Sequence, residues 1–375
     1  MNRHINTRSK VDHVKRSVSA EAHRGGRVIT AWIAGDCWLK PGEGTTDLRE
    51  LYGNFRPDLL ILNLECAVPA GPVRTGRRAL LPLDANRLSE LAIAENTVCI
   101  VANNHISDFG SEGVLATLRA LRQAGIRSVG AGVSLAEARA PVIVEVAGRR
   151  IGLLAYADTA PHVGAVAATD QAPGVAPLIP QTIIADLRGL ASQVDDAWLF
   201  LHWGREYSRY PEPEQRDLAR AFAEAGAHLI AGVHPHVVCG KERITNALVY
   251  YSLGNFLFPP IPLADGAILH WDQVSRQGLT LMGIFEGRDW RWLDILHVTS
   301  EDGRPHLPVP PAERSMTHEF ARLSASFTDG YARKYSSIRW RENLLHAARR
   351  LWMMTWPERV RLLGRLARAA HVVHE

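Results

Sequence analysis

Side chains that bind divalent metals recur at the ends of short apolar runs in this sequence. Runs such as RVITAWIAGD, DLLILNLE and AHLIAGVHPH are typical of buried strands. The strands of one sheet bring their carboxyl ends to a common edge, so side chains distant in sequence can meet there. We therefore expect one site to contain Asp36, Glu65, Asn104 with His105, His202, His234 and His236.

His234 and His236 flank a proline in the segment GVHPH. Two residues apart at a strand end, their rings can face one side only if the backbone is extended, and Pro235 favours that conformation. Imidazole is the commonest protein ligand for zinc and similar ions. The segment therefore predicts a pair of metal ligands on an extended backbone.

The mixture of carboxylate, imidazole and amide groups suits manganese, zinc or iron better than calcium. The sequence leaves open whether one or two divalent ions bind. Because a carboxylate can bridge, two ions roughly 3.5–4 Å apart could activate water for in-line attack on a phosphoryl group.

Cys37 and Cys66 directly follow Asp36 and Glu65. A thiolate ligand is the alternative to a structural role for these cysteines, but strand alternation turns neighbouring side chains to opposite faces and favours the structural role.

The elements that position these residues alternate between strand and helix from about residue 28 to about 258. The segment 107–126 is a clear amphipathic helix, with Val114, Leu118 and Leu121 on one face. A hairpin is expected through Gly148. This alternation is typical of a layered α/β fold. Two long aperiodic segments, 159–180 and 259–277, are candidates for loops that cover the site.

The two ends of the chain differ from its centre. Residues 1–27 form a basic segment that we expect to be disordered, residues 28–300 the α/β domain, and residues 312–375 an arginine-rich helical tail. Trp352, Met353 and Trp356 in this tail could meet a membrane surface. The alternative, packing against the α/β body or a partner in a homo-oligomer, agrees with the usual role of apolar stripes at helical spacing.

Composition narrows the class of protein further. The 375 residues are 46% apolar, which allows a large core, and the four cysteines are unclustered, which is typical of a reduced compartment. No secretion signal and no run of ~20 apolar residues is evident, so we expect a cytoplasmic protein. Arginine outnumbers lysine 38 to 5, and much of the excess lies at the two ends. No nucleic-acid partner is expected, whereas a small anionic substrate agrees with this balance.

Several sequence blocks resemble a known family. GDCWL, NLE, ANNHISDFG, HWGREY, GVHPHV and YYSLGNFLF occur in this order, as they do in the CapA-like poly-γ-glutamate capsule biosynthesis family, which is similar to the calcineurin-like metallophosphoesterases. The resemblance covers roughly residues 28–290. It implies a layered metallophosphoesterase-like fold in which β-sheets are flanked by helices, here with a C-terminal helical extension.

The resemblance also implies roles for individual residues. Asp36 and His236 would hold one ion, Asn104, His202 and His234 the other, and Glu65 would bridge them. His105 would act as general acid or transition-state stabiliser, with Asp108 orienting its ring. Three further residues are assigned to substrate or to supporting contacts, with a plain loop role as the alternative: Glu206, Tyr207 and Asn255.

The chain departs from the resemblance at two points. Calcineurin-like enzymes carry a histidine two residues after the first aspartate. At that position this chain has Trp38. The capsule family generally lacks that histidine as well. This leaves single-metal chemistry, or none, open. Capsule proteins of the family commonly carry an N-terminal membrane anchor, and no such segment is evident in this sequence.

The sequence therefore supports a metal-dependent hydrolase, in the first place a phosphoesterase. The alternatives are a non-catalytic partner in making a γ-linked glutamate polymer, with the arginine-rich tail as its docking element, and an enzyme that acts on γ-glutamyl amide bonds.

Overall fold

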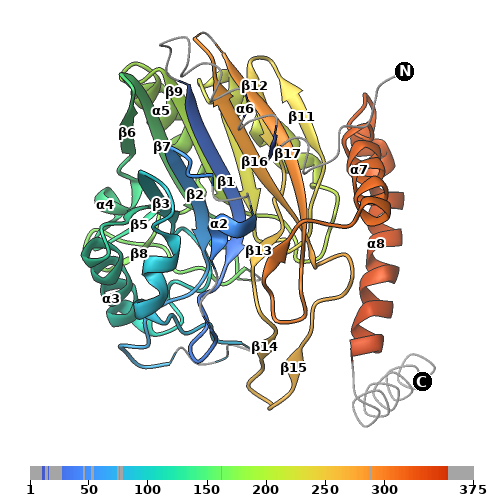
Figure 1. Ribbon diagram of the computed structural model, residues 1–375, viewed down its shortest axis with the longest axis horizontal. Helices are drawn as coiled ribbons and strands as arrows, with labels where there is room; N and C mark the ends of the chain where they lie inside the picture. Colours follow the sequence, from blue (N-terminus) through green and yellow to red (C-terminus); the bar gives the residue numbers. More distant parts are fainter. Residues whose placement is uncertain are drawn as a thin grey trace, which may run out of the picture. The chain divides into compact units, whose positions relative to one another are not determined.

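The computed structural model shows a chain divided into two compact units, Met1–Thr328 and Asp329–Glu375 (Figure 1). It describes residues 11–12, 16, 28–44, 47–51, 55–73, 76, 79–161, 163–287 and 289–353. The described strands all belong to the first unit, and the described part of the second is the helix α8 (Tyr331–Met353). The predicted disorder of residues 1–27 falls almost wholly outside the described residues. In the part of the chain that is described, no helix is long and apolar enough to cross a membrane.

The first sheet has eight strands, seven of them in the order β18-β17-β16-β1-β2-β3-β4, with β13 paired to the end of β1. Strands β1 to β4 run parallel, because each crossover returns the chain to the same end of the sheet. The strands of this sheet are β1 (Ile29–Cys37), β2 (Leu59–Leu64), β3 (Asn96–Ile100), β4 (Arg127–Val129), β13 (Asn255–Leu257), β16 (Gln277–Phe285), β17 (Trp290–Thr299) and β18 (Pro305–His306).

The second sheet has the order β11-β12-β10-β9-β7-β6. Its four central strands are parallel, and its two edge strands are antiparallel to their neighbours. The expected hairpin joins β6 to β7 through Ala147 and Gly148, both of which have positive φ. The strands are β6 (Val142–Val146), β7 (Arg149–Ala157), β9 (Asp196–His202), β10 (Leu229–Val233), β11 (Lys241–Ile244) and β12 (Ala247–Tyr250).

Alternation along β9 shows how the layers are held together. Trp198 and Phe200 point into the core that the two sheets share, whereas Leu199 and Leu201 point to the other face, which α5 and α6 cover. Each such fully buried side chain contributes ~1.5–3 kcal/mol to the free energy of folding. The helices of the first unit are α2 (Leu48–Leu51), the 3-10 helix η1 (Ala85–Leu91), α3 (Gly110–Gln123), α4 (Leu135–Arg139), α5 (Pro180–Ala191), α6 (Pro213–Glu224) and α7 (Pro310–Ser324).

The layered α/β fold with β-sheets flanked by helices is confirmed (Figure 1). The expected amphipathic helix is α3, in which Val114, Leu118 and Leu121 are buried. The predicted C-terminal extension contains the helices α7 and α8, but α7 belongs to the first unit. Its Ser324 Oγ accepts a hydrogen bond from the backbone N–H of Lys241, at 3.0 Å. The side chains of Trp352, Met353 and Trp356 lie outside the described residues.

A bulge at Gly35 sets the direction of the end of β1. The pairing of β1 with β2 shifts register between Ala34 and Asp36, which leaves Gly35 as the extra residue. A Cβ on Gly35 would lie 1.9 Å from the backbone oxygen of Gly254, and the same oxygen accepts a hydrogen bond from the N–H of Asp36 at 3.0 Å. Only glycine allows this approach, which re-aims the following side chain.

Replacing Gly35 with alanine should therefore lower the free energy of unfolding by ~2 kcal/mol or more, because β1 and the segment around Gly254 must separate. The midpoint of urea unfolding, followed by circular dichroism, measures this loss. Gly189→Ala is the matched control: it lies in α5 with open space around the added methyl group, and should be neutral or stabilising by up to ~1 kcal/mol. Equal stability of Gly35→Ala and the wild type would contradict this explanation of the bulge.

Candidate metal centre

Two groups of potential metal ligands share one carboxylate. The first group contains Asp36, Glu65 and His236, and the second contains Glu65, His202 and His234. Within each group the ligand atoms all lie within 4.8 Å of one another, and all five residues are buried. The structure thus brings together five side chains from four distant parts of the chain.

These groups lie at the carboxyl ends of strands from both sheets. Asp36 lies near the end of β1, and Glu65 directly follows β2. His202 is the last residue of β9, and His234 directly follows β10. The expectation that a single sheet edge supplies all the ligands is therefore wrong. Because the two sheets pack face to face with their parallel strands ending at the same side, two edges supply them.

The Glu65 side chain lies between the two groups. Its Oε1 is 3.8 Å from His236 Nε2 and 3.9 Å from His202 Nε2. This oxygen is buried and accepts no hydrogen bond. A buried, unsatisfied carboxylate oxygen is costly unless a cation or a donor satisfies it. Glu65 therefore lies between the two groups of potential ligands, in the position that a bridging ligand would occupy.

The electrostatics of the pocket favour a positive charge. Burial raises the pKa of Glu65 well above its usual range, and the nearby charge of Asp36 raises it further. Burial alone would lower the pKa of His236, but the negative charges of Glu65 and Asp36 outweigh this effect and raise it to about 10. A divalent cation would supply the positive charge directly, so the residues present fit a metal.

Asn63 holds both carboxylates in place. Its Nδ2 donates to Asp36 Oδ1 at 2.8 Å and to Glu65 Oε2 at 3.3 Å. Its Oδ1 accepts from Asn103 Nδ2 at 3.2 Å. The sequence analysis missed Asn63, although a buried asparagine two residues before Glu65, on the same face of an apolar strand, was a usable signal.

Asn103 shapes the loop that carries Asn104 and His105. Its Oδ1 accepts hydrogen bonds from the backbone N–H groups of His105, at 3.1 Å, and Ile106, at 2.9 Å. The sequence analysis missed this asparagine as well. With the loop held in this way, Asn104 Oδ1 lies 3.0 Å from His202 Nε2. The structure thus places Asn104 beside the second group of ligands, where the resemblance puts it.

Asn255 lies behind His236 and is completely buried. Its Nδ2 donates to the backbone oxygen of Ser275 at 3.0 Å, which turns its Oδ1 toward His236 Nδ1 at 2.9 Å. His236 Nδ1 is then the donor, and its Nε2 faces Glu65. This position favours a supporting role for Asn255, behind a potential metal ligand, over contact with substrate.

The backbone of the GVHPH segment is not extended. His234 has φ of 98° and His236 has φ of 56°, in the left-handed region that non-glycine residues rarely adopt. The expectation of an extended segment is therefore wrong. The reason is that the two rings serve different groups of ligands: His234 lies 4.5 Å, centroid to centroid, from His202, while His236 belongs with Asp36. Strain of this kind concentrates at functional sites.

His105 and Asp108 form a hydrogen-bonded pair beside the two groups. His105 Nδ1 lies 2.7 Å from Asp108 Oδ2, which also accepts from the backbone N–H of Leu81 at 2.9 Å. Asp108 is fully buried, whereas the His105 side chain is 12% exposed. The carboxylate therefore orients the ring through Nδ1.

A cavity of about 150 Å³ opens onto His105. Glu206 and Tyr207 line it, as does His105, and Tyr207 has φ of 64°. The two long aperiodic segments predicted as covering loops supply an apolar wall of this cavity. Segment 159–180 contributes Val163. Segment 259–277 contributes a short hairpin of β14 (Ile261–Pro262) and β15 (Ile268–Leu269). The first segment also contains a short strand, β8 (Gly174–Val175), which pairs with β5 (Ala131–Gly132). The wall residues are Val163, Ile261, Leu263, Leu269 and Trp271.

Trp38 and two cysteines near the ligands have other surroundings. The Trp38 ring is buried, and its Nε1 donates to the backbone oxygen of Pro82 at 2.8 Å. Cys37 and Cys66 are buried, and burial raises the pKa of both thiols well above the usual range. Among the described residues, neither thiol belongs to a group of potential metal ligands, which favours the structural role for both.

Comparison with known proteins gives the class of protein. A family model described as bacterial capsule synthesis protein PGA_cap matches residues 23–260, which is more than half of the chain. The chain belongs to this family of capsule synthesis proteins.

Two relatives from this comparison are the capsule biosynthesis protein CapA of Bacillus anthracis and the PGA biosynthesis protein CapA of Bacillus subtilis. The first is 34% identical over 43% of this chain and 40% of that protein, and the second is 37% identical over 43% and 42%. The matched part thus spans less than half the length of either relative. A solved structure similar to this chain is the calcineurin-like phosphoesterase YfkN from Bacillus subtilis, with 14% identity, a TM-score of 0.41, and coverage of 78% of this chain and 97% of that chain.

The shared position of Glu65 leads to a test of metal content. Glu65→Gln keeps the shape of the side chain but removes its charge, so both groups lose a ligand and affinity for divalent metal should fall ~10–100-fold or more. Elemental analysis after dialysis against manganese measures the ions bound per chain. Glu301→Gln, at an exposed turn, is the control and should bind as the wild type does. Full metal content in Glu65→Gln would argue against the bridge.

Proposed function

We propose that this protein is a metal-dependent hydrolase, in the first place a phosphoesterase. The observation that carries the proposal is the position of one buried carboxylate, Glu65, between two groups of ligands, next to an oriented histidine at the mouth of a cavity. The class of chemistry is also suggested by the resemblance to calcineurin-like enzymes. The metal itself, manganese, zinc or iron, is left open by the donor set.

The ligand sets follow from the geometry. Asp36, Glu65 and His236 would hold one ion, and Glu65, His202 and His234, with Asn104 beside them, would hold the other. Such ions lower the pKa of water and neutralise charge on a phosphoryl group. The protein prepares the site in advance, because Asn63 fixes the carboxylates and Asn255 fixes the His236 ring.

His105 would act on the leaving group. With Nδ1–H held by Asp108, the doubly protonated ring would give its Nε2 proton to a leaving oxygen or stabilise charge on the phosphoryl oxygens. Because Asp108 is fully buried and also bonded to the backbone of Leu81, the ring cannot turn without losing this contact. Glu206 and Tyr207 border the same cavity and would contact the remainder of the substrate.

His105→Ala should lower kcat for p-nitrophenyl phosphate and its bis ester by ~10²–10⁴-fold while the metal content stays unchanged. Asp108→Asn should lower kcat less, and it should alter the pH profile because the orientation of the ring is disturbed. His306→Ala, at an exposed position, is the control. If the manganese-loaded wild type hydrolyses no phosphate ester but cleaves γ-glutamyl peptides in a His105-dependent way, the reaction is amide hydrolysis and the phosphoesterase proposal fails.

Family membership supports a second candidate function. The chain would then be a non-catalytic component in making a γ-linked glutamate polymer, with its arginine-rich C-terminal residues as the docking element. The division after Thr328 defines where to cut, because α7 belongs to the first unit. On α8, Trp340 and Leu344 are 64% and 52% exposed, which suits a docking role.

On this second candidate, deletion of residues 329–375 should abolish capture of the polymer-forming enzymes and leave metal content unchanged. Co-purification from cells that make the polymer measures capture, and full-length Glu65→Gln serves as the matched control that should retain it. Capture by the truncated chain would rule out this docking element. The cytoplasmic location, contact of the tail with a membrane surface, and a homo-oligomer stay predictions.

A further inference from the structure

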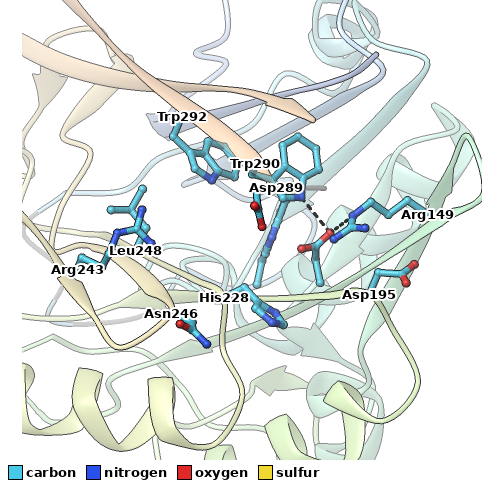
Figure 2. Close-up of a pocket in the computed structure, with 11 residues that line it drawn as sticks. Arg149, Asp195, His228, Arg243, Asn246, Leu248, Asp289, Trp290 and Trp292 are labelled. Atoms are coloured by element: carbon cyan, nitrogen blue, oxygen red, sulfur yellow. Dashed lines mark hydrogen bonds and ion pairs between the residues drawn. The ribbon is translucent and has the colours of Figure 1, made fainter. Parts of the chain in front are cut away.

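A second cavity, of about 440 Å³, lies at the end of the second sheet opposite the candidate metal centre. Figure 2 shows the residues that line it. Asp196, which begins β9, lines this cavity, whereas His202, which ends β9, belongs to the metal centre. Six residues of extended strand separate the two sites by about 20 Å. The cavity therefore cannot be part of the active-site mouth, and its volume falls in the range of small-molecule sites.

Three tryptophans form one wall of this cavity. Trp290 and Trp292 come from β17 of the first sheet and stack on each other, with ring centroids 5.3 Å apart and planes at 23°. Trp198 from β9 of the second sheet meets both rings edge-on, at 5.1 and 5.4 Å. Trp198 is buried, whereas Trp290 and Trp292 are half-buried and border the cavity. Large, half-exposed indole rings gathered in a cavity are the usual basis of ligand recognition.

A buried carboxylate fixes these rings in place. Asp196 is 3% exposed, and its Oδ2 accepts hydrogen bonds from Trp290 Nε1 at 2.9 Å and from Arg149 Nε at 2.5 Å. In Figure 2, one dashed line runs from Trp290 to this carboxylate and another from Arg149 to it. The polar edge of the indole is thus satisfied by the protein, which leaves its carbon surface to meet a ligand.

The rim of the cavity offers both donors and acceptors. His228 Nδ1 accepts from the backbone N–H of Ala197 at 3.1 Å, so the neutral ring carries its proton on Nε2, a donor. Figure 2 shows His228 and Asn246 below the tryptophans, with Arg243 on one side and Asp195 on the other. His228, Asn246, Arg243 and Asp195 are all exposed.

The charges around the cavity nearly cancel. Asp195, Asp196 and Asp289 oppose Arg149 and Arg243, a formal balance of about −1 among these five groups. A highly charged ligand of either sign would meet repulsion as well as attraction. A neutral ligand that has an apolar face and a rim of groups able both to donate and to accept fits better, and a sugar ring has this chemistry: its C–H face packs on an indole, and its hydroxyls pair with amide, carboxylate and imidazole groups.

We propose that this cavity binds a sugar ring of a neutral carbohydrate, at a site independent of the metal centre. The site combines an aromatic wall, to which both sheets contribute, with polar groups that lie mainly at the starts of strands of the second sheet. It does not require the proposed hydrolase activity, because none of its lining residues belongs to the groups of metal ligands.

The test titrates the full-length protein with glucose, galactose, N-acetylglucosamine and their β-1,4-linked disaccharides, using saturation-transfer NMR and tryptophan fluorescence. At least one saccharide should bind saturably at ~0.1–10 mM. Asn246→Ala and Asp289→Ala, both exposed, should each weaken it ~3–10-fold without unfolding the protein. Trp292→Ala should abolish binding, and Trp292→Phe should restore part of it.

Two controls separate this site from the rest of the protein. Glu65→Gln should bind the saccharide normally, because it alters only the metal centre, and Trp340→Ala should also bind normally, because it removes an exposed tryptophan elsewhere. Binding that persists in Trp292→Ala, or that Glu65→Gln removes, would overturn the proposal. So would failure of every saccharide to bind at ~50 mM. Saturable binding of choline in place of the sugars would show a cation site instead.

Discussion

A buried carboxylate without a hydrogen-bond donor on one oxygen is the constraint on which the candidate metal centre depends. Glu65 Oε1 faces two histidine rings at nearly equal distances, and its other oxygen is held by Asn63. A buried, uncompensated carboxylate costs several kcal/mol. The nearby Asp36 adds to this cost, and the raised pKa of His236 is the response of the protein to it. A divalent cation would offset the charge of both carboxylates while His236 became a neutral ligand.

The two-sheet architecture allows distant parts of the chain to supply side chains to this one site. Parallel strands of both sheets end at one side, so short loops after β1, β2, β3, β9 and β10 meet there. The bulge at Gly35 and the positive φ of His234 and His236 then aim individual side chains. The opposite end of β9 borders the tryptophan cavity, which is why one fold can carry two separate sites.

The sequence predicted the layered fold, because strand and helix periods alternate clearly, and the structure brings five of its predicted ligands into two groups that could hold metal ions. It could not predict that two sheets supply the ligands, since local patterns do not reveal how strands are distributed between sheets. The conformation of the GVHPH segment was mispredicted because the different targets of its two rings override the local preference set by Pro235. Asn63 was missed since a polar residue inside an apolar strand resembles a tolerated exception until its partners are known, and Asn103 since an asparagine in a loop is common without a functional role.

Anomalous diffraction from crystals grown with manganese tests the central claim most directly. The account predicts two anomalous peaks ~3.5–4 Å apart, with Glu65 between them and His202 and His236 on different ions. A single peak away from Glu65, or no peak within reach of either histidine, would contradict it.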